Sequence, residues 1–64
     1  MLELRDIDGY KMAVNPKKVE YIQDANVMWG RCTALCFTGG NRVYVDEEYE
    51  RVKRMLDDAL AAEV

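Results

Sequence analysis

The sequence predicts an α+β fold, in which a five-stranded antiparallel β-meander is followed by one C-terminal amphipathic helix within a single small domain, residues 1–64. Two observations predict it. Up to residue 45, short runs of alternating apolar and polar residues are separated by turn-forming residues, as in antiparallel strands. After Asp46, apolar residues recur every three or four positions, which is typical of an amphipathic helix.

A β-hairpin is predicted at the start of the chain. Its strands cover residues 2–7 and 10–14, where larger apolar side chains alternate with polar or smaller ones. The Asp8-Gly9 dipeptide between them readily adopts the positive φ angles of a tight turn. Asn15-Pro16 ends the second strand, because proline has no N–H to donate to a neighbouring strand.

Three further strands are predicted at residues 17–23, 31–37 and 42–45, with a loop or an irregular hairpin over 24–30. The strand over 31–37 is apolar on both faces. Such a strand lies inside a sandwich, under a helix or against another subunit. Residues 38–41, Thr-Gly-Gly-Asn, are interpreted as a hairpin turn and not as a phosphate-binding loop, because the lysine and the following helix of such a loop are missing.

The C-terminal helix is predicted over residues 47–62. Asp46 is a good N-cap, and Glu47 and Glu48 suit the positive end of the helix dipole. The apolar residues of this segment share one face of the helix, and charged residues cover the other, so the helix is expected to lie on one face of the sheet.

Self-association is expected because the chain is short. A domain of this length hides only about 60% of its unfolded surface and is marginally stable alone. Disulfides or a structural metal would help, but the sequence has two Cys and no His. A homo-oligomer is therefore predicted, and these residues are its candidate interface: Met28, Trp29, Phe37, Tyr49, Val52, Met55, Leu56 and Leu60.

The residue inventory argues against an enzyme. Without His or Ser the chain cannot form a Ser-His-Asp triad or a Cys-His pair, so no catalytic residues, cofactor or metal are predicted. Cys32 and Cys36 lie four residues apart on a strand, which separates them by ~13 Å, too far for a disulfide. They are interpreted as small buried apolar side chains, with a metal site or a disulfide shared between subunits as the alternative.

The charge distribution disfavours nucleic acid as a partner. The net charge is −3, and the acidic excess lies in residues 46–64. No apolar run is long enough to span a membrane, and no leader or lipidation signal is present, so a cytoplasmic location is expected.

A small anion or a nucleotide, held between subunits as in a phage-type accessory protein, is the alternative partner. Basic side chains on the strands could contact its charge, and tyrosines could stack on its ring. The candidate ligand-binding residues are Arg5, Tyr10, Lys11, Lys17, Lys18, Tyr21, Arg31, Arg42 and Tyr44.

A succession of turns and alternating apolar residues runs through the chain: Leu4, Ile7-Asp8-Gly9, Val14-Asn15-Pro16, Val19-Glu20-x-Ile22, Thr33-x-Leu35-x-Phe37-Thr38-Gly39-Gly40, Val43-x-Val45-x-Glu47 and Val52. It resembles the short flagellar FlbD/SwrD family over nearly the whole length. The resemblance implies a small accessory protein that affects flagellar motility, without catalysis. Residues 27–30 and the two Cys depart from the family pattern.

A second resemblance involves fewer residues, Met1-Leu2-x-Leu4 and Val45-x-Glu47-x-Tyr49-x-Arg51. These segments are similar to the carbon-storage regulator CsrA, which implies five strands, a C-terminal helix, a dimer and RNA binding. The basic tail expected of that family is replaced here by residues 60–64, Leu-Ala-Ala-Glu-Val.

Overall fold

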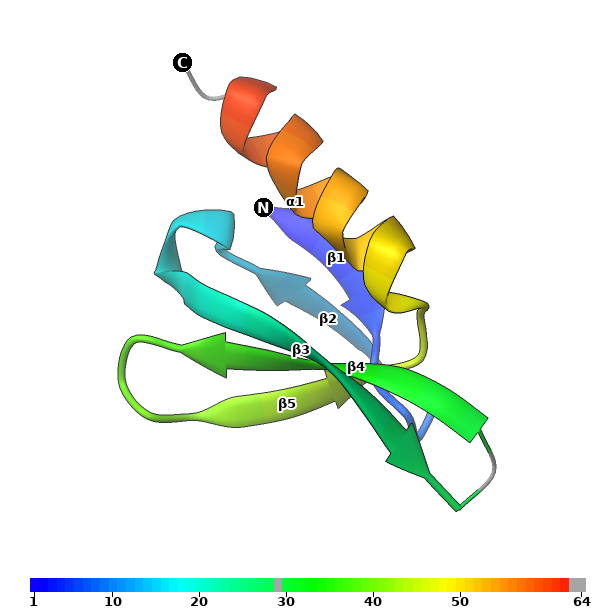
Figure 1. The fold of residues 1–64 in the computed structure, drawn as a ribbon. Coiled ribbons are helices and arrows are strands. Elements are labelled where there is room, and N and C mark those ends of the chain that lie inside the picture. The colour runs from blue at the N-terminus through cyan, green and yellow to red at the C-terminus, as the bar shows by residue number, and fades with distance from the viewer. Residues whose placement is uncertain (29, 63–64) are drawn as a thin grey trace.

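A computed structural model describes residues 1–28 and 30–62 of the chain (Figure 1). The elements follow in the order β1 (Leu2–Arg5), β2 (Lys11–Val14), a 3-10 helix η1 (Pro16–Lys18), β3 (Val19–Val27), β4 (Gly30–Phe37), β5 (Arg42–Val45) and α1 (Tyr49–Ala62). The predicted α+β class, with antiparallel strands and one C-terminal helix, is confirmed.

The strands form two sheets, so the prediction of one five-stranded meander is wrong. β1 pairs with β2 in a two-stranded sheet, and β3, β4 and β5 form a three-stranded sheet in that order. The sheets meet at one corner, where Asp6 forms an isolated bridge with Val45 and the amide of Asp46 donates to the carbonyl of Arg5 at 3.1 Å. The end of β1 therefore contacts the end of β5, while β2 and β3 are not paired.

The 3-10 helix η1 separates β2 from β3. The side chain of Asn15 accepts a hydrogen bond from the amide of Lys17 at 3.0 Å, and the carbonyl of Asn15 accepts from Lys18 at 3.0 Å. Pro16 occupies the first helical position, where its missing N–H costs nothing, and its side chain is buried. This turn redirects the chain, so the predicted strand at 17–23 starts at Val19 instead.

The turn between β1 and β2 is organised by Asp6. Its carboxylate accepts hydrogen bonds from the amides of Asp8 and Tyr10, both at 2.9 Å, and its carbonyl accepts from Gly9 at 3.0 Å. Gly9 has a φ of 90°, as the Asp8-Gly9 dipeptide predicted. The predicted strands at 2–7 and 10–14 are shortened to 2–5 and 11–14, because Asp6–Tyr10 form this wider turn.

Of the two alternatives predicted for residues 24–30, a loop or an irregular hairpin, the structure has a hairpin. Asp24–Val27 belong to β3 and pair regularly with β4 up to Val27 opposite Gly30. Asp and Asn are poor strand formers, but pairing with a neighbouring apolar strand outweighs that weak preference. β3 is thus nine residues long and β4 eight.

The helix begins at Tyr49, two residues later than predicted. The amide of Asp46, the predicted N-cap, is bonded to β1, and the carbonyl of Glu48 accepts the helical hydrogen bond from Val52 at 3.0 Å. The segment between β5 and α1 is therefore held by the sheets before the helix starts.

The core lies between the two sheets and α1. Every element except β3 contributes at least one buried apolar side chain, and β3 adds the half-buried Val19 and Ile22. The buried cluster comprises Leu4, Val14, Leu35, Val45, Val52 and Leu56. Figure 1 shows α1 beside β1 along the top of the molecule, with β5 on the opposite side, away from the helix. The helix contacts both β1 and β3.

Candidate functional site

One edge of the three-stranded sheet is formed by β3. On one side β3 pairs with β4. On its other side, the outer edge of the sheet, no strand within the described residues pairs with it. In an antiparallel strand, every second residue directs its N–H and C=O away from the paired neighbour. A bulge interrupts the register between Val19 and Tyr21, and from Tyr21 to Val27 the pairing is regular. This stretch can accept another strand.

A groove runs beside this edge, between β3 and α1. Its apolar lining includes Pro16, Val19 and Ile22 below, and Leu56 of the helix, and its volume is about 320 Å³. We call it the α1–β3 groove. Tyr49 and Leu60 line it from the helix, and Leu60 is 40% exposed.

The α1–β3 groove carries charges of both signs. Glu20 lines it from the strand, and Lys53 and Asp57 from the helix. The groove therefore offers apolar surface bordered by mixed charge, which is the usual composition of a protein contact. A surface with both signs can also complement a second copy of itself.

The strand register sorts the three-stranded sheet into two faces. Ile22, Leu35 and Val43 form one cross-strand row and pack toward α1, on what we call the inner face. Tyr21, Cys36 and Arg42 form a row on the opposite, outer face. The next outer row is Gln23, Ala34 and Tyr44.

Both faces of β4 are covered within one chain. Cys32, Ala34 and Cys36 of the outer face are at most 5% exposed, although no helix lies there. They are short, and the longer side chains of the flanking strands border them. Covering β4 therefore does not require another subunit, and the apolar character of this strand is not evidence for one.

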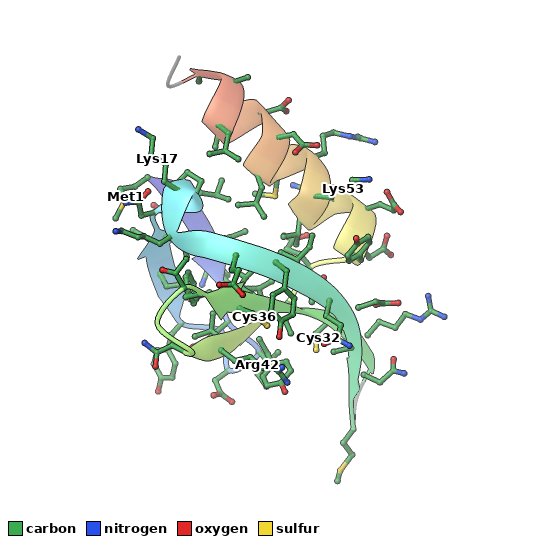
Figure 2. All side chains as sticks on the ribbon, turned by 60° about the vertical axis from the view of Figure 1, so that its left-hand side comes forward. Met1, Lys17, Cys32, Cys36, Arg42 and Lys53 are labelled. Atoms are coloured by element: carbon green, nitrogen blue, oxygen red, sulfur yellow. The ribbon has the colours of Figure 1, made fainter. Side chains whose placement is uncertain are left out.

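Arg42 lies over the outer face of the sheet. Figure 2 shows it with Cys32 and Cys36 on the side of the sheet that faces away from α1. Its guanidinium donates to the hydroxyl of Tyr21 at 3.4 Å. Hydrogen bonds with Tyr44, Tyr21 and Cys36 raise the pKa of Arg42 above its ordinary value, so it is charged at every accessible pH.

A polar pocket opens next to Arg42. Its volume is about 200 Å³, and Thr38 and Asn41 of the β4–β5 turn line it together with Glu20 and Tyr21. The turn is closed by hydrogen bonds from Phe37 to Asn41 at 2.8 Å and from Gly40 to Phe37 at 2.9 Å. Polar groups from three strands and a turn thus converge on this corner of the outer face.

The predicted interface residues fall into separate groups. Val52 and Leu56 belong to the core, at 0% and 7% exposure, which removes them from any free surface. Phe37 and Met55 are half-buried and pack against the core. Met28 is 97% exposed, and Trp29 lies outside the described residues. Of the seven that the structure describes, Tyr49 and Leu60 are the two that line the α1–β3 groove without belonging to the buried core.

The predicted ligand-binding residues are also dispersed. Tyr21, Arg42 and Tyr44 share the outer face. The remainder lie in the β1–β2 hairpin, in η1 and at the far end of β4: Arg5, Tyr10, Lys11, Lys17, Lys18 and Arg31. No single site unites the nine residues.

Sequence analysis missed the residues that depend on tertiary contact. Glu20, Thr38 and Asn41 line the polar pocket, and Lys53 and Asp57 line the α1–β3 groove. Their only sequence signal was the polar character of a turn or of a helix face. Which of those polar residues border a cavity depends on how the strands pair.

Burial of Cys32 favours the neutral form of its thiol. Desolvation, followed by the negative charges of Asp24 and Asp46, raises the pKa of its thiol from the ordinary value of 9.0. Cys32 and Cys36 are both free. Among residues 1–28 and 30–62, no three Cys, Asp or Glu side chains gather closely enough to hold a metal ion.

Comparisons with protein-family models, with curated proteins and with solved structures found no match. The resemblances to the FlbD/SwrD family and to CsrA therefore stay predictions. In the part of the chain that the structure describes, every helix is too short or too polar to cross a lipid bilayer.

Proposed function

We propose that this chain is a non-enzymatic interaction module of the cytoplasm that works as a homo-oligomer, and that two copies join along β3. The observation that carries the proposal is the regular, unpaired edge of β3 beside the α1–β3 groove. A regulatory accessory role of the FlbD/SwrD type is consistent with such a module. The FlbD/SwrD resemblance supplies that role.

The edge of β3 has little of the protection that edge strands usually have. Natural sheets protect their edges with proline, lysine, bulges or a covering element. Here the bulge lies at the start of the strand, Tyr21–Val27 contain neither proline nor lysine, and Asp24 is the one charged residue of this stretch. Pairing with a second β3 would satisfy part of the outward backbone groups and extend the sheet from three strands to six.

The charges along β3 select a register for this pairing. Antiparallel strands that cross at Tyr21 pair residues 19–23 of the two copies. This crossing brings Lys18, which ends η1 directly before β3, near Asp24 of the second copy, and the two-fold axis forms this attraction twice. Crossing at Ile22 instead would place Glu20 opposite Asp24 of the second copy, where like charges repel. Both registers keep the two inner faces on the same side, and the first is electrostatically favoured.

The α1–β3 groove supplies the apolar part of the contact. A stable interface buries about 800 Å² on each partner, and the chain exposes 4670 Å² in total. One strand pair alone does not reach that area, so the neighbouring surface of Leu60 and Tyr49 must take part. Burying this surface also strengthens a fold whose own buried cluster has six apolar members.

The test is the mass of the protein in solution. Sedimentation equilibrium at micromolar concentration should give a dimer for the parent chain. Lys18→Glu should weaken the dimer on the order of tenfold, because two attractions become repulsions of roughly 0.2–1 kcal/mol each. The double variant Lys18→Glu with Asp24→Lys should restore the parent affinity, because the pair is reversed.

Lys11→Glu is the matched control, since Lys11 is an exposed lysine on β2 that lies outside the proposed contact. It changes the net charge equally and should leave the dissociation constant unchanged. A single-chain mass for the parent protein together with a cooperative melt would refute self-association. A dimer that ignores Lys18→Glu would instead exclude the β3 register.

A further inference from the structure

We propose that Arg42, together with the hydroxyls of Tyr21 and Tyr44, binds the oxyanion group of a small ligand, a phosphate or a carboxylate, on the outer face of the three-stranded sheet. Tyr21 belongs to the edge strand β3 and also lines the α1–β3 groove, but Arg42 and Tyr44 come from β5, and the site is complete in a single chain. The observation behind it is an unneutralised guanidinium held among tyrosines.

The sheet register builds the site. Tyr21 and Arg42 are cross-strand neighbours on either side of Cys36, and Tyr44 lies two residues after Arg42 on the same face. The short side chain of Cys36 is nearly buried, so it forms the base of a depression between the longer side chains of Tyr21 and Arg42. Tyr21 and Tyr44 are 48% and 36% exposed, which leaves their rings and hydroxyls accessible to a ligand.

The hydrogen bond between Arg42 and Tyr21 leaves donor groups of both side chains available to a ligand. The hydroxyl oxygen of Tyr21 accepts a hydrogen bond from the Arg42 guanidinium at 3.4 Å, so its own O–H is free to donate elsewhere. Arginine carries five N–H donors in a planar fork that matches the two oxygens of a carboxylate or phosphate. In the part of the chain that the structure describes, no carboxylate forms an ion pair with Arg42.

The pocket beside Arg42 sets the size of the ligand. Its volume is about 200 Å³, below the roughly 300–1,000 Å³ of pockets for drug-sized molecules. It therefore fits one charged group, with Thr38 and Asn41 as additional polar contacts. The rest of a ligand would lie over the exposed tyrosine rings.

Glu20 also lines this pocket, and its carboxylate opposes a bare anion. Glu20→Gln should therefore tighten the binding of an inorganic anion. A natural ligand that carries a hydrogen-bond donor next to its oxyanion would donate that hydrogen bond to the Glu20 carboxylate, so Glu20 would then favour binding.

The experiment is a titration of the full chain followed by amide chemical shifts at low ionic strength. Inorganic phosphate and acetate are added in separate arms, which distinguish the phosphate source from the carboxylate source. At least one probe should shift the amides of Tyr21, Arg42 and Tyr44 together. Arg42→Gln should weaken that binding by about tenfold or more, which corresponds to one charge-assisted contact.

Arg31→Gln is the matched control. Arg31 is an exposed arginine that borders a different pocket with Asp24, Glu48 and Glu50, so its removal should leave binding unchanged. Tyr44→Phe keeps the ring, removes the hydroxyl and should weaken binding by a few-fold. Unchanged amide dispersion in each variant shows that the fold is intact.

Two results would overturn the proposal. The first is the lack of a concerted shift at these three residues with either anion. The second is an equal loss of binding in Arg42→Gln and Arg31→Gln, because that would mean attraction to overall charge without a site. Neither result bears on the solution mass, so this proposal and the β3 dimer fail independently.

Discussion

The hydroxyl of Thr33 donates a 2.8 Å hydrogen bond to the backbone carbonyl of Glu47. Thr33 lies on β4 and is completely buried, and Glu47 belongs to the short segment between β5 and α1. The bond therefore fastens the entrance of the helix to the central strand of the sheet. It satisfies both polar groups where water cannot reach Thr33.

Replacing Thr33 by Val should destabilise the fold by about 1–3 kcal/mol, because the shape is kept while the carbonyl of Glu47 loses its donor. Urea unfolding followed by circular dichroism measures the change. Thr33→Ser keeps the hydroxyl and should cost less than Thr33→Val. Thr38→Val, at an exposed threonine, should stay within about 0.5 kcal/mol of the parent. Equal losses for Thr33→Val and Thr33→Ser would show that the lost packing matters more than the bond.

Asp6→Ala should destabilise the β1–β2 hairpin by about 1 kcal/mol, because two turn amides lose their acceptor. Asp6→Asn retains an oxygen acceptor and should lose less. Thermal unfolding monitored by circular dichroism gives the comparison. Asp8→Ala serves as the control, since Asp8 is exposed and contributes its amide to this turn. A larger effect at Asp8 than at Asp6 would contradict the assignment of the turn.

Gly40→Ala should cost about 1–2 kcal/mol, because Gly40 has a φ of 86°, where a side chain strains the backbone. Nothing lies within 4 Å of the added Cβ, so the loss would come from the backbone alone. Gly39→Ala is the matched control in the same turn. Its φ is not positive, and its Cβ would meet only Asn41 Nδ2 at 3.9 Å. Unfolding midpoints of the two variants should therefore differ, and equal midpoints would rule out backbone strain as the cause.

Ionisation of the buried Cys32 thiol should lower the free energy of unfolding at alkaline pH. Burial raises the pKa of the Cys32 thiol above its ordinary value of 9.0. The folded state therefore holds this proton more tightly than the unfolded state does. The associated stability is fully present below about pH 9 and is lost as the pH rises through the folded pKa.

The measurement compares the parent chain with Cys32→Ala in urea unfolding at pH 7 and at pH 10. The two proteins share every other ionisable group, so the contributions of those groups cancel in the difference. The stability advantage of the parent over Cys32→Ala should shrink at pH 10. A difference that stays constant across this range would show that the buried thiol is not the titrating group.

Local patterns predicted most elements but not the connection between the sheets. Residues 42–45 form the predicted strand, and the apolar positions Val52 and Leu56 of the predicted helix are buried in the core. The meander was wrong because Asn15 and Pro16 build a helical turn that prevents β2 from pairing with β3. At residues 24–30 the hairpin alternative holds and the loop does not, because pairing with β4 overrides the weak strand preference of Asp24 and Asn26.

The candidate sites were predicted less well than the elements. Nine residues were predicted to bind a ligand, and Tyr21, Arg42 and Tyr44 were among them. The strand register places these three on one face of the sheet. Val52 and Leu56 were predicted to lie in the interface because the sequence of an apolar helix face is the same whether the sheet or another subunit covers that face. Burial within the chain assigns both to the core.

The sequence by itself determined the fold class, the positions of the turns and the apolar face of the helix. These follow from the alternation of side chains and from the backbone preferences of Gly, Pro and Asn, which act between near neighbours in the chain. Only the tertiary structure decided that β1 meets β5 at Asp6 and Val45, that β3 has an open edge, and that Arg42 lies beside Tyr21. The physical reason is that these relationships join residues more than 20 positions apart, or leave a strand without a partner. Such pairings depend on how all elements share one core.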